Sequence, residues 1–584
     1  MWICLDWGGC PQRFNRIIGY WGGGQQAELE KRLSYAVNAA GESPSTHPQY
    51  SASQNPNGAF WGMACLRPTE GEGAGPDAWI RVDEQTLIMG REPFGRVPLY
   101  WMQMDQVIWF ASHLSLLLPI VDGIEISLPA VYGYSCFSYV PTPLTPVAGI
   151  FTISTGVEQT WTFHNGAIAA PQWQRSLEWQ ESPQPLEDEP TAIDQLQTLL
   201  KNSIQGQIAD LNQGPVGIFL SGGLDSSIVA ALLVQAGVKV RAYTLDFGSA
   251  GIPEHPYAQA IADFLKIPLV RVKATPRRIR QALIPTAQAL DLPFGDGVTV
   301  PLFLLGQTAS QEVKVIFNGE GGDQLFAGWT NKPLIAASIY QTEHPSERDF
   351  TQQYLRTFHR LWGYESQIFQ PEVYAQVKQW LPQDWLKDAL DPAFGRSLLH
   401  RLRRANLMLK GAQNIHPRAT RLGLAHGLEV RSPFCDLPLA QWAFRIPGEL
   451  YLRGSCEKYI LKRAVEPWLP PEIVWRPKRG MGVPLTSWCF DELWHELGRW
   501  LNPKYLQQEG IWQPDLVTRI VLGKLGTIQG RRIGESLWLL LMWQAWRSAV
   551  LKEPGPHFSW HPLFSLPSWL GRLYLQFHRN TESW

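Results

Sequence analysis

The spacing of apolar residues changes near residue 190. Before it, short apolar runs at 79–90 and 97–112, broken by Gly, Pro and Asn nearby, are typical of strands. After it, an amphipathic helix over 191–211 opens a series of strand–helix alternations. This series has strands at 215–220, 239–247, 267–274 and 313–326 (the last running into a loop) and helices at 226–236 and 257–265. Such alternation predicts a parallel sheet wrapped by helices.

The same patterns divide the chain into four predicted segments. They are a β-rich domain over 1–165, a linker over 166–190, an α/β domain with a mostly helical extension over 191–550, and a C-terminal tail over 551–584. The linker is clearest in the proline- and acid-rich stretch 182–190. We also predict a long loop over the turn-rich stretch 38–58, and Gly237 as the left-handed residue that ends helix 226–236.

Composition narrows the class of protein. The formal net charge of -1 gives no sign of a nucleic-acid partner. The 7 cysteines are scattered without a C-x-x-C pair, so they predict neither a zinc site nor a disulfide framework. There is no signal-peptide pattern and no apolar run of ~18 residues, which predicts a cytoplasmic protein without a membrane span. The 27 tryptophans follow no fixed period and are interpreted as packing residues.

One stretch carries candidate chemistry. Strand 215–220 breaks on Ser221-Gly222-Gly223-Leu224-Asp225-Ser226-Ser227 and a helix follows at once. Glycines allow a ligand to approach the backbone, and free N–H groups at a helix start suit a phosphate. The acid inside an anion site makes sense if Mg²⁺ bridges it to phosphate oxygens. The alternative is an ordinary βα turn with Asp225 or Ser226 as the helix cap. The P-loop signature G-x-x-x-x-G-K-[ST] is absent, so this is another class of nucleotide site.

These residues resemble the pyrophosphate-loop motif of ATP pyrophosphatases, and within that group the chain is similar to the asparagine synthetase family. Four further segments match in family order: "DLPFGDGVTVPLFLL" (291–305), "NGEGGDQLFAG" (318–328), "LAHGLEVRSPFCD" (424–436) and "EKYILKRAVEPWLPPEIVWRPKRGMGVPL" (457–485). The resemblance implies an α/β fold. It would join a doubly wound parallel-sheet ATP pyrophosphatase domain to an α+β, glutaminase-like β-sandwich of the Ntn-hydrolase type.

The resemblance also implies roles for matching residues. Those that would bind ATP are Leu220, Ser221, Gly222, Gly223, Asp225, Ser226, Ser227, Leu245 (against adenine), Asn318 and Gly319. Asp225 and Asp323 would hold Mg²⁺, Glu320 would be the general base, and Lys458 would neutralise transition-state charge. Arg431 would be a structural or a phosphate-side residue. Taken singly, Asp323 would more often be a loop cap, Glu320 a solvated acid and Lys458 an exposed helical lysine. Gln324 departs from the family pattern, which has Glu there.

The N-terminal segment departs further. Family members of this type begin Met-Cys-Gly, and removal of Met exposes a cysteine whose own amino group is the base for glutamine hydrolysis. Here Met1, Trp2 and Ile3 precede Cys4. The backbone nitrogen of Cys4 is therefore an amide, which cannot act as the base for the thiol. Only removal of three residues would restore it. Segments 90–101, 110–118 and 139–156 still resemble the family's, which predicts a retained domain fold without glutaminase chemistry.

The leading hypothesis is an ATP- and Mg²⁺-dependent ligase that adenylates a carboxylate of a small molecule or peptide and joins it to ammonia or a substrate amine. The alternatives are a lasso-peptide-type macrocyclase, a glutamine-hydrolysing asparagine synthase and a catalytically silent scaffold. β-Lactam synthetases, which also have a disabled N-terminal domain, resemble the chain less because they have Tyr at the position of Glu320. The resemblance leaves a homodimer open.

Overall fold

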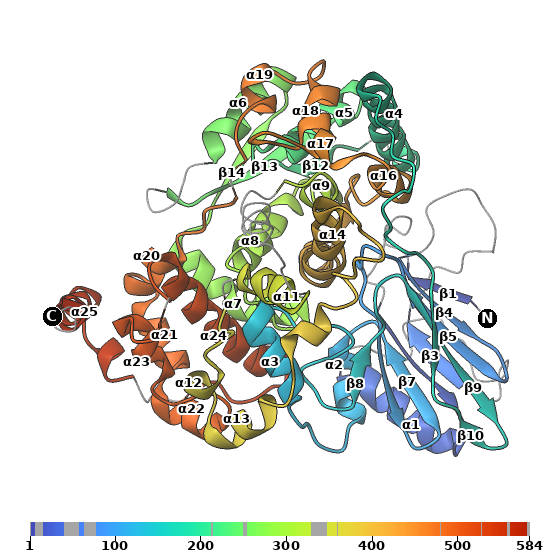
Figure 1. Cartoon of the computed structure of the whole chain (residues 1–584). Coiled ribbons are helices and arrows are strands. Elements are labelled where there is room, and N and C mark those ends of the chain that lie inside the picture. The colour runs from blue at the N-terminus through green and yellow to red at the C-terminus, as the bar shows by residue number, and fades with distance from the viewer. Residues whose placement is uncertain are drawn as a thin grey trace.

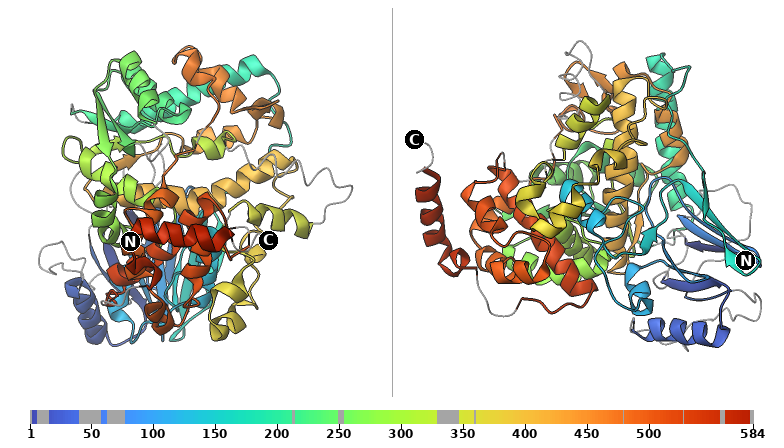
Figure 2. Two further views of the ribbon diagram at one scale, coloured as in Figure 1. Left: turned by 90° about the vertical axis from the view of Figure 1, so that its left-hand side faces the viewer. Right: turned by 60° about the horizontal axis from the view of Figure 1, so that its bottom comes forward.

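The computed structural model describes residues 2–5, 16–39, 58–62, 77–211, 214–248, 254–328, 347–358, 360–478, 480–526, 528–556 and 561–580. Only the backbone is described for 2–5, 58–62, 347–349 and 576–580. In Figure 1 two antiparallel sheets lie at the lower right, a parallel sheet at the top and a group of C-terminal helices at the lower left. The right-hand view of Figure 2 separates the antiparallel sheets from these helices.

Two antiparallel sheets form the N-terminal part. The first has the order β1 (Trp2–Leu5), β4 (Ala78–Val82), β5 (Thr86–Arg91), β9 (Val157–His164) and β10 (Ala167–Ile168), with β11 (Gln172–Arg175) also on β9. The second has the order β3 (Gly58–Gly62), β2 (Ile17–Gly22), β7 (Val107–Ala111), β6 (Tyr100–Met104) and β8 (Ile150–Thr152). Helices of this part are α1 (Gln26–Ala39), α2 (Leu114–Leu117), η3 (Leu118–Ile120) and α3 (Leu128–Phe137).

Strand β2 shows how alternation builds this sandwich. Ile17 and Trp21 belong to the apolar cluster that also contains Ile80 of β4 and Trp161 of β9, so they face the other sheet. Ile18 and Tyr20 belong to the cluster that contains Leu33 and Val37 of α1. Successive side chains of a strand point to opposite faces, which lets one strand bury both sides. The β-rich prediction for this part is confirmed, although the stretch 40–57, within the predicted loop, lies outside the described residues.

Two strands correct the predicted linker. Residues 166–190 were predicted to be a linker, and part of this stretch belongs to the first sheet, since β10 and β11 both pair with β9, and β11 pairs over Gln172–Arg175. Their side chains are half-buried or exposed, so the sequence there lacks the apolar alternation that marks a strand. The open edge of β9 supplies the backbone partners. The helix predicted from 191 begins at Glu189, where the Asp188 carboxylate caps it by accepting from the Thr191 N–H.

A five-stranded parallel sheet follows, as the alternation predicted. Its order is β14 (Leu269–Lys273), β13 (Val240–Asp246), β12 (Val216–Phe219), β15 (Val315–Phe317) and β16 (Glu429–Arg431). Helix α4 (Glu189–Ile208) precedes these strands, and the helices between them include α5 (Leu224–Gln235), α6 (His255–Leu265), α7 (Pro276–Leu290), α8 (Thr299–Ala309) and α9 (Gly322–Leu325). Gly237 follows α5 with φ 76°, in the left-handed conformation expected of it.

The remainder is mainly helical. It contains α11 (Glu347–Arg356), α12 (Glu365–Ile368), α13 (Pro371–Val377), η5 (Pro382–Trp385), α14 (Leu398–Ala405), the π-helix η6 (Asn406–Ile415), α15 (His416–Leu424), α16 (Leu437–Ala443), α17 (Gly448–Tyr451), α18 (Tyr459–Val465) and α19 (Pro471–Val474). Then come α20 (Leu485–Phe490), α21 (Trp494–Trp500), α22 (Pro503–Glu509), α23 (Leu516–Leu522), α24 (Arg531–Val550), η7 (Leu563–Ser565) and α25 (Ser568–Asn580). A hairpin joins β17 (Leu452–Arg453) to β18 (Cys456–Glu457).

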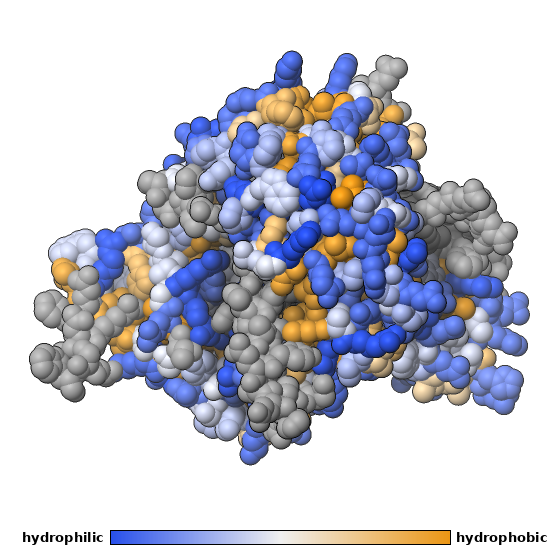
Figure 3. All heavy atoms as spheres, turned by 45° about the horizontal axis from the view of Figure 1, so that its top comes forward, coloured by the Kyte–Doolittle hydropathy of each residue, from blue (hydrophilic) through white to orange (hydrophobic). Residues whose placement is uncertain are grey.

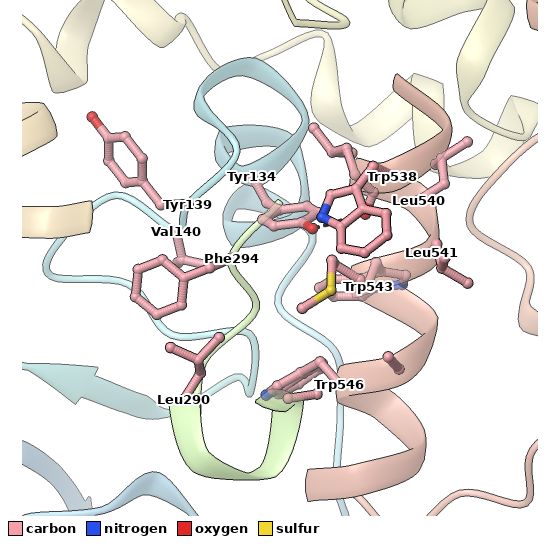
Figure 4. Close-up of a cluster of buried hydrophobic side chains, with 14 of the residues drawn as sticks. Tyr134, Tyr139, Val140, Leu290, Phe294, Trp538, Leu540, Leu541, Trp543 and Trp546 are labelled. Carbon is pink, nitrogen blue, oxygen red and sulfur yellow. Dashed lines mark hydrogen bonds between the residues drawn. The ribbon is translucent and has the colours of Figure 1, made fainter. Parts of the chain in front are cut away.

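Helix α24 packs against helix α3 of the N-terminal part and against the end of α7 in the α/β part. Figure 4 shows Trp538, Trp543 and Trp546 of α24 directed toward Tyr134 of α3 and the end of α7. The Tyr134 hydroxyl donates to the carbonyl of Leu539 at 2.8 Å, and the Trp546 indole donates to that of Asp291 at 3.1 Å. These three tryptophans are fully buried, which confirms their interpretation as packing residues.

The face drawn in Figure 3 is mostly hydrophilic, with smaller hydrophobic patches among the polar atoms. Within the described ranges, none of the helices combines the length and apolar character that a membrane span requires.

Candidate active site

The order of the parallel strands fixes where a ligand would bind. Chain order runs from β12 to β13 on one side, whereas β15 pairs with β12 on the other, so the strand order reverses between β12 and β15. In open α/β sheets, ligands bind at the carboxyl ends of the strands at such a reversal. The loop 221–223 follows β12 and the loop 318–321 follows β15. Both predicted segments therefore meet at one crevice.

The loop after β12 is shaped by its own hydroxyl groups. The Ser227 hydroxyl donates to the carbonyl of Gly223 at 2.8 Å, and the N–H of Gly223 donates to Ser221 Oγ at 3.2 Å. Gly222 has φ 72°, and a Cβ there would lie 2.5 Å from the backbone nitrogen of Ala258 in α6. A side chain at 222 would push the loop off α6. The first N–H groups of a helix have no partner within it, and Gly223, Asp225 and Ser226 at the start of α5 line the cavity, which is where an anion would bind.

A cavity of about 270 Å³ occupies this crevice. Ten of the predicted residues line it: Leu220, Ser221, Gly223, Asp225, Ser226, Leu245, Asn318, Gly319, Glu320 and Asp323. Apolar residues of α8 and α15 form another part of the wall, including Leu302, Leu305 and Leu422. The cavity therefore joins an apolar part to a strongly charged end.

The charged end is a compact set of two carboxylates and two ammonium groups. Lys458 Nζ lies 2.6 and 2.5 Å from the two oxygens of Asp225 and 2.5 Å from Asp323 Oδ1. Lys478 Nζ lies 2.7 Å from Asp323 Oδ2 and 3.9 Å from Asp225 Oδ2. Gly328 makes this approach possible, because a Cβ there would lie 2.0 Å from Asp323 Oδ1 and 2.1 Å from Lys458 Cε.

Burial and charge act differently on the two carboxylates. Burial raises the pKa of Asp225, whose side chain is 11% exposed, and Lys458 only partly opposes this rise. Burial alone would also raise the pKa of Asp323, but Lys458 and Lys478 hold it well below its usual range. The two carboxylates differ in their partners, since both lysines lie within 2.7 Å of Asp323 whereas only Lys458 lies that close to Asp225. The pKa of Lys478 is raised despite burial by the carboxylates of Asp323 and Asp225.

Glu320 is half-buried on the cavity wall. Its N–H donates to Asn318 Oδ1 at 3.0 Å, and the same oxygen accepts from the Ser432 hydroxyl at 2.8 Å, so the loop is held in place from β16. Burial raises the pKa of Glu320, while Arg418 opposes the rise and Asp323 adds to it. A carboxylate with a raised pKa beside a cavity has the property expected of a general base.

Three of the residues predicted to bind ATP or metal or to act in catalysis do not line the cavity. Gly222 and Ser227 shape the loop from behind, and Lys458 is 2% exposed and lies beneath the carboxylates. The unusual Gln324 is also outside the lining. It is 3% exposed and packs toward Gly411 of η6, and its Oε1 has no hydrogen-bond partner among the described residues.

The contacts of Arg431 favour the structural one of its two predicted roles. Its guanidinium donates to both oxygens of Asp210 at 2.7 and 3.0 Å, to Glu429 at 2.6 Å and to the carbonyl of Gln207. These contacts join β16 to the end of α4. Arg431 is not among the cavity-lining residues.

We therefore expect Arg431→Met to lower stability without changing nucleotide binding. Losing one partner of a nearly buried ion pair costs about 3 kcal/mol, because Glu429 then keeps a charge that is poorly solvated. Urea unfolding and the affinity for a non-hydrolysable ATP analogue check this. A large loss of affinity at unchanged stability would instead favour the phosphate-side role.

The cavity also contains charged residues that the sequence did not identify. Lys478 and Arg476 line it, as do Glu254 and Tyr257 at the start of α6. The Arg476 guanidinium lies 3.9 Å from the centre of the Tyr257 ring, and burial raises the pKa of Glu254. Arg476 and Lys478 both belong to segment 457–485, one of the segments that carry the resemblance, so the resemblance was a signal from which they could have been found.

Cys4 lies inside a paired strand. It is opposite Trp79 in the register of β1 with β4, and Trp2 and Ile3 are paired ahead of it. Nothing beyond the backbone is described there.

Comparison with known proteins identifies the family of the chain. A model of the asparagine synthase family matches residues 195–548, which include all of the cavity's charged residues. The chain belongs to the asparagine synthase family. It is 24% identical over 504 residues to "Asparagine synthetase [glutamine-hydrolyzing] 1" of Bacillus subtilis, covering 81% of this chain and 76% of that protein. It is 28% identical over 528 residues to "Putative asparagine synthetase [glutamine-hydrolyzing]" of Mycobacterium tuberculosis, covering 84% and 78%.

Membership in the asparagine synthase family makes the protein an ATP-dependent ligase that forms carbon–nitrogen bonds. Among solved structures, the NMN synthetase of Francisella tularensis is similar over 40% of this chain and 96% of that one, at 14% identity and a TM-score of 0.20. The fold assignment rests on the strand order.

Proposed function

We propose that the protein adenylates a carboxylate with ATP and transfers the acyl group to ammonia or to a substrate amine, without hydrolysing glutamine. The observation that carries this proposal is the meeting of Asp225, Asp323, Lys478 and Glu320 on one cavity beside the loop 221–223. A phosphate-binding loop, two acids and a basic carboxylate are the parts that adenylation followed by amide formation requires.

In the first step, the N–H groups at the start of α5 would hold the ATP phosphates. A substrate carboxylate oxygen attacks the α-phosphorus, the bond to the β-phosphate oxygen breaks, and acyl-AMP and pyrophosphate form. Negative charge moves to the leaving pyrophosphate, and Lys478 on the cavity wall would stabilise it. Lys458 would act from beneath the carboxylates.

In the second step, the amine attacks the acyl carbon and AMP leaves. Glu320 would accept the proton that the attacking nitrogen must lose. Its raised pKa makes it a better proton acceptor than an exposed glutamate. The apolar wall from α8 and α15 would keep water from the acyl-AMP, whose hydrolysis would waste ATP.

The donor set fits Mg²⁺. Asp225 and Asp323 both reach one nitrogen at 2.5 Å, so their oxygens are close enough to share one cation. Among the described residues no group of three His, Cys, Asp or Glu forms a metal site, so Mg²⁺ would take its other ligands from phosphates and water, as it usually does. When bound, the ion would neutralise phosphate charge during pyrophosphate departure.

ATP–pyrophosphate exchange tests the proposal. Labelled pyrophosphate should enter ATP only in the presence of a carboxylate that the enzyme activates. We would compare aspartate with ammonium against linear peptides bearing both an amine and an acidic side chain, and identify products by mass. Exchange with no carboxylate from either class would overturn the adenylation step.

Cys4 leads to a prediction about the nitrogen source. Because its nitrogen is a peptide amide within β1, it lacks the amino group that would act as base, and we expect glutamine not to supply nitrogen. Where free ammonia is the amine, ammonium should support product formation, and Cys4→Ala should leave the rate unchanged. Product with ¹⁵N from amide-labelled glutamine that disappears in Cys4→Ala would contradict the prediction.

A further inference from the structure

Lys458 occupies the position between the two acids that a metal ion would need. Its Nζ contacts Asp225 Oδ2 at 2.5 Å and Asp323 Oδ1 at 2.5 Å, and Lys478 adds a contact to Asp323 at 2.7 Å. Lys458 thus donates hydrogen bonds to both oxygens of Asp225 and forms an ion pair with Asp323 Oδ1, which has no hydrogen-bond partner among the described residues, while Lys478 forms an ion pair with Asp323 Oδ2.

The charges of this group balance. Two carboxylates face two ammonium groups, and Lys458 is 2% exposed, so it cannot turn to solvent without a rearrangement. Its backbone is fixed as well, with φ 56° at the N-terminal cap of α18. A divalent cation arriving alone would meet a neutral group whose oxygens are already in use, and it would be repelled by two nearby positive charges.

Mg²⁺ and an ammonium group compete directly for these oxygens. Mg²⁺ requires oxygen ligands at about 2.0–2.1 Å in a nearly octahedral arrangement, which leaves no room for Lys458 on the same atoms. The lysines can give up the carboxylates only if other acceptors are within reach. Nucleotide phosphates in the cavity would provide one for Lys478, which lines the cavity beside Ser221, Gly223 and Ser226. Lys458 does not line the cavity and would reach the phosphates only through the rearrangement that its burial requires.

We propose that Lys458 and Lys478 keep divalent metal off Asp225 and Asp323 until nucleotide phosphates accept the two ammonium groups, so that the metal binds only together with the nucleotide. Lys478 thereby becomes a phosphate-binding residue of the site. This inference rests on the proposed function, since it assumes that nucleotide phosphates enter this cavity.

Mn²⁺ binding to the full-length protein tests the exchange without any catalysis. The free ion is measured by electron paramagnetic resonance, with and without α,β-methylene-ATP, for the wild type, Lys458→Met and Lys478→Met. Lys239→Met, an exposed lysine before β13, is the matched control. We expect the wild type and the control to bind Mn²⁺ tightly only with the nucleotide. Each site variant should bind Mn²⁺ alone at least about tenfold more tightly than the wild type, because one repelling charge is gone.

Adding Asp323→Asn to Lys478→Met should abolish the gain, which identifies the carboxylate pair as the metal site. Lys478→Met keeps the test valid if Lys458→Met does not fold. The Lys478 side chain is 26% exposed, so replacing it disturbs the packing less than replacing the more buried Lys458. Mn²⁺ binding to the wild type alone as tightly as to both lysine variants would overturn the inference. Failure of every form to bind the nucleotide analogue would instead overturn the proposed function.

Discussion

Asp225→Asn is expected to reduce ATP–pyrophosphate exchange by about 10²- to 10³-fold, the range seen when a preorganised charge-stabilising group is lost. Asn keeps the shape of the side chain but removes its charge from the carboxylate pair. Asp225 lies closely against the loop after β15: a Cβ on Gly319 or Gly322 would approach Asp225 atoms to 3.0 Å or less. The new side chain therefore has no room to shift, and it cannot compensate for the lost charge by moving.

The same change affects the lysines. Lys458 would retain only Asp323 as an ionised partner. The group would then contain one carboxylate and two ammonium groups and would carry a net positive charge. Nucleotide phosphates could still bind to that charge. We therefore expect the affinity for ATP without metal to be retained or increased, while the affinity for the metal–nucleotide complex falls. Equilibrium binding of a fluorescent ATP analogue, with and without Mg²⁺, separates these two effects.

Asp263→Asn is the matched control. Asp263 is an exposed acid of α6 whose carboxylate accepts from the Gln259 side chain at 2.8 Å, and it is not among the cavity-lining residues. It should leave exchange unchanged. Exchange by Asp225→Asn at the wild-type rate, in protein with a wild-type unfolding transition, would show that the pair is not the metal site.

What could be predicted from sequence depended on local patterns. Strand–helix alternation identifies β12 to β15 because each element repeats its own apolar period over a few residues. The segment 221–227 was recognisable because its glycines and hydroxyls serve local geometry. The pattern did not give the strand order. The reversal between β12 and β15, which creates the crevice, is set by long-range pairing that leaves no period in the chain.

The same limit of local patterns applies to three basic residues near the site, Lys458, Lys478 and Arg431. Each is a basic residue in a matched segment, and no spacing rule tells which one faces a ligand. Lys458 is turned under the carboxylates by its left-handed backbone, Lys478 reaches the cavity, and Arg431 turns away toward Asp210. These differences depend on where β16 and α18 pack, which is a property of the tertiary structure. β11 was missed for a related reason, because a polar edge strand shows no alternation.

Glu320→Gln is expected to separate the two chemical steps. The adenylation step needs no base, so exchange should remain near the wild-type rate. Amide formation from ammonium or an alkylamine should fall by about 10²- to 10⁴-fold, the usual contribution of a general base. The amide side chain has nearly the same size, so the half-buried position should tolerate it.

Two further measurements identify Glu320 as the base. Burial raises its pKa above the ordinary 4.5, so the proton-accepting form is lost at a higher pH than for an exposed glutamate. Wild-type amide formation should therefore fall relative to exchange as the pH drops through that raised pKa, and Glu320→Gln should lack this step. Hydroxylamine, which is largely neutral near pH 7 and needs little help to lose a proton, should restore product in the variant. Equal loss of exchange and of hydroxamate in Glu320→Gln would mean that Glu320 serves the first step instead.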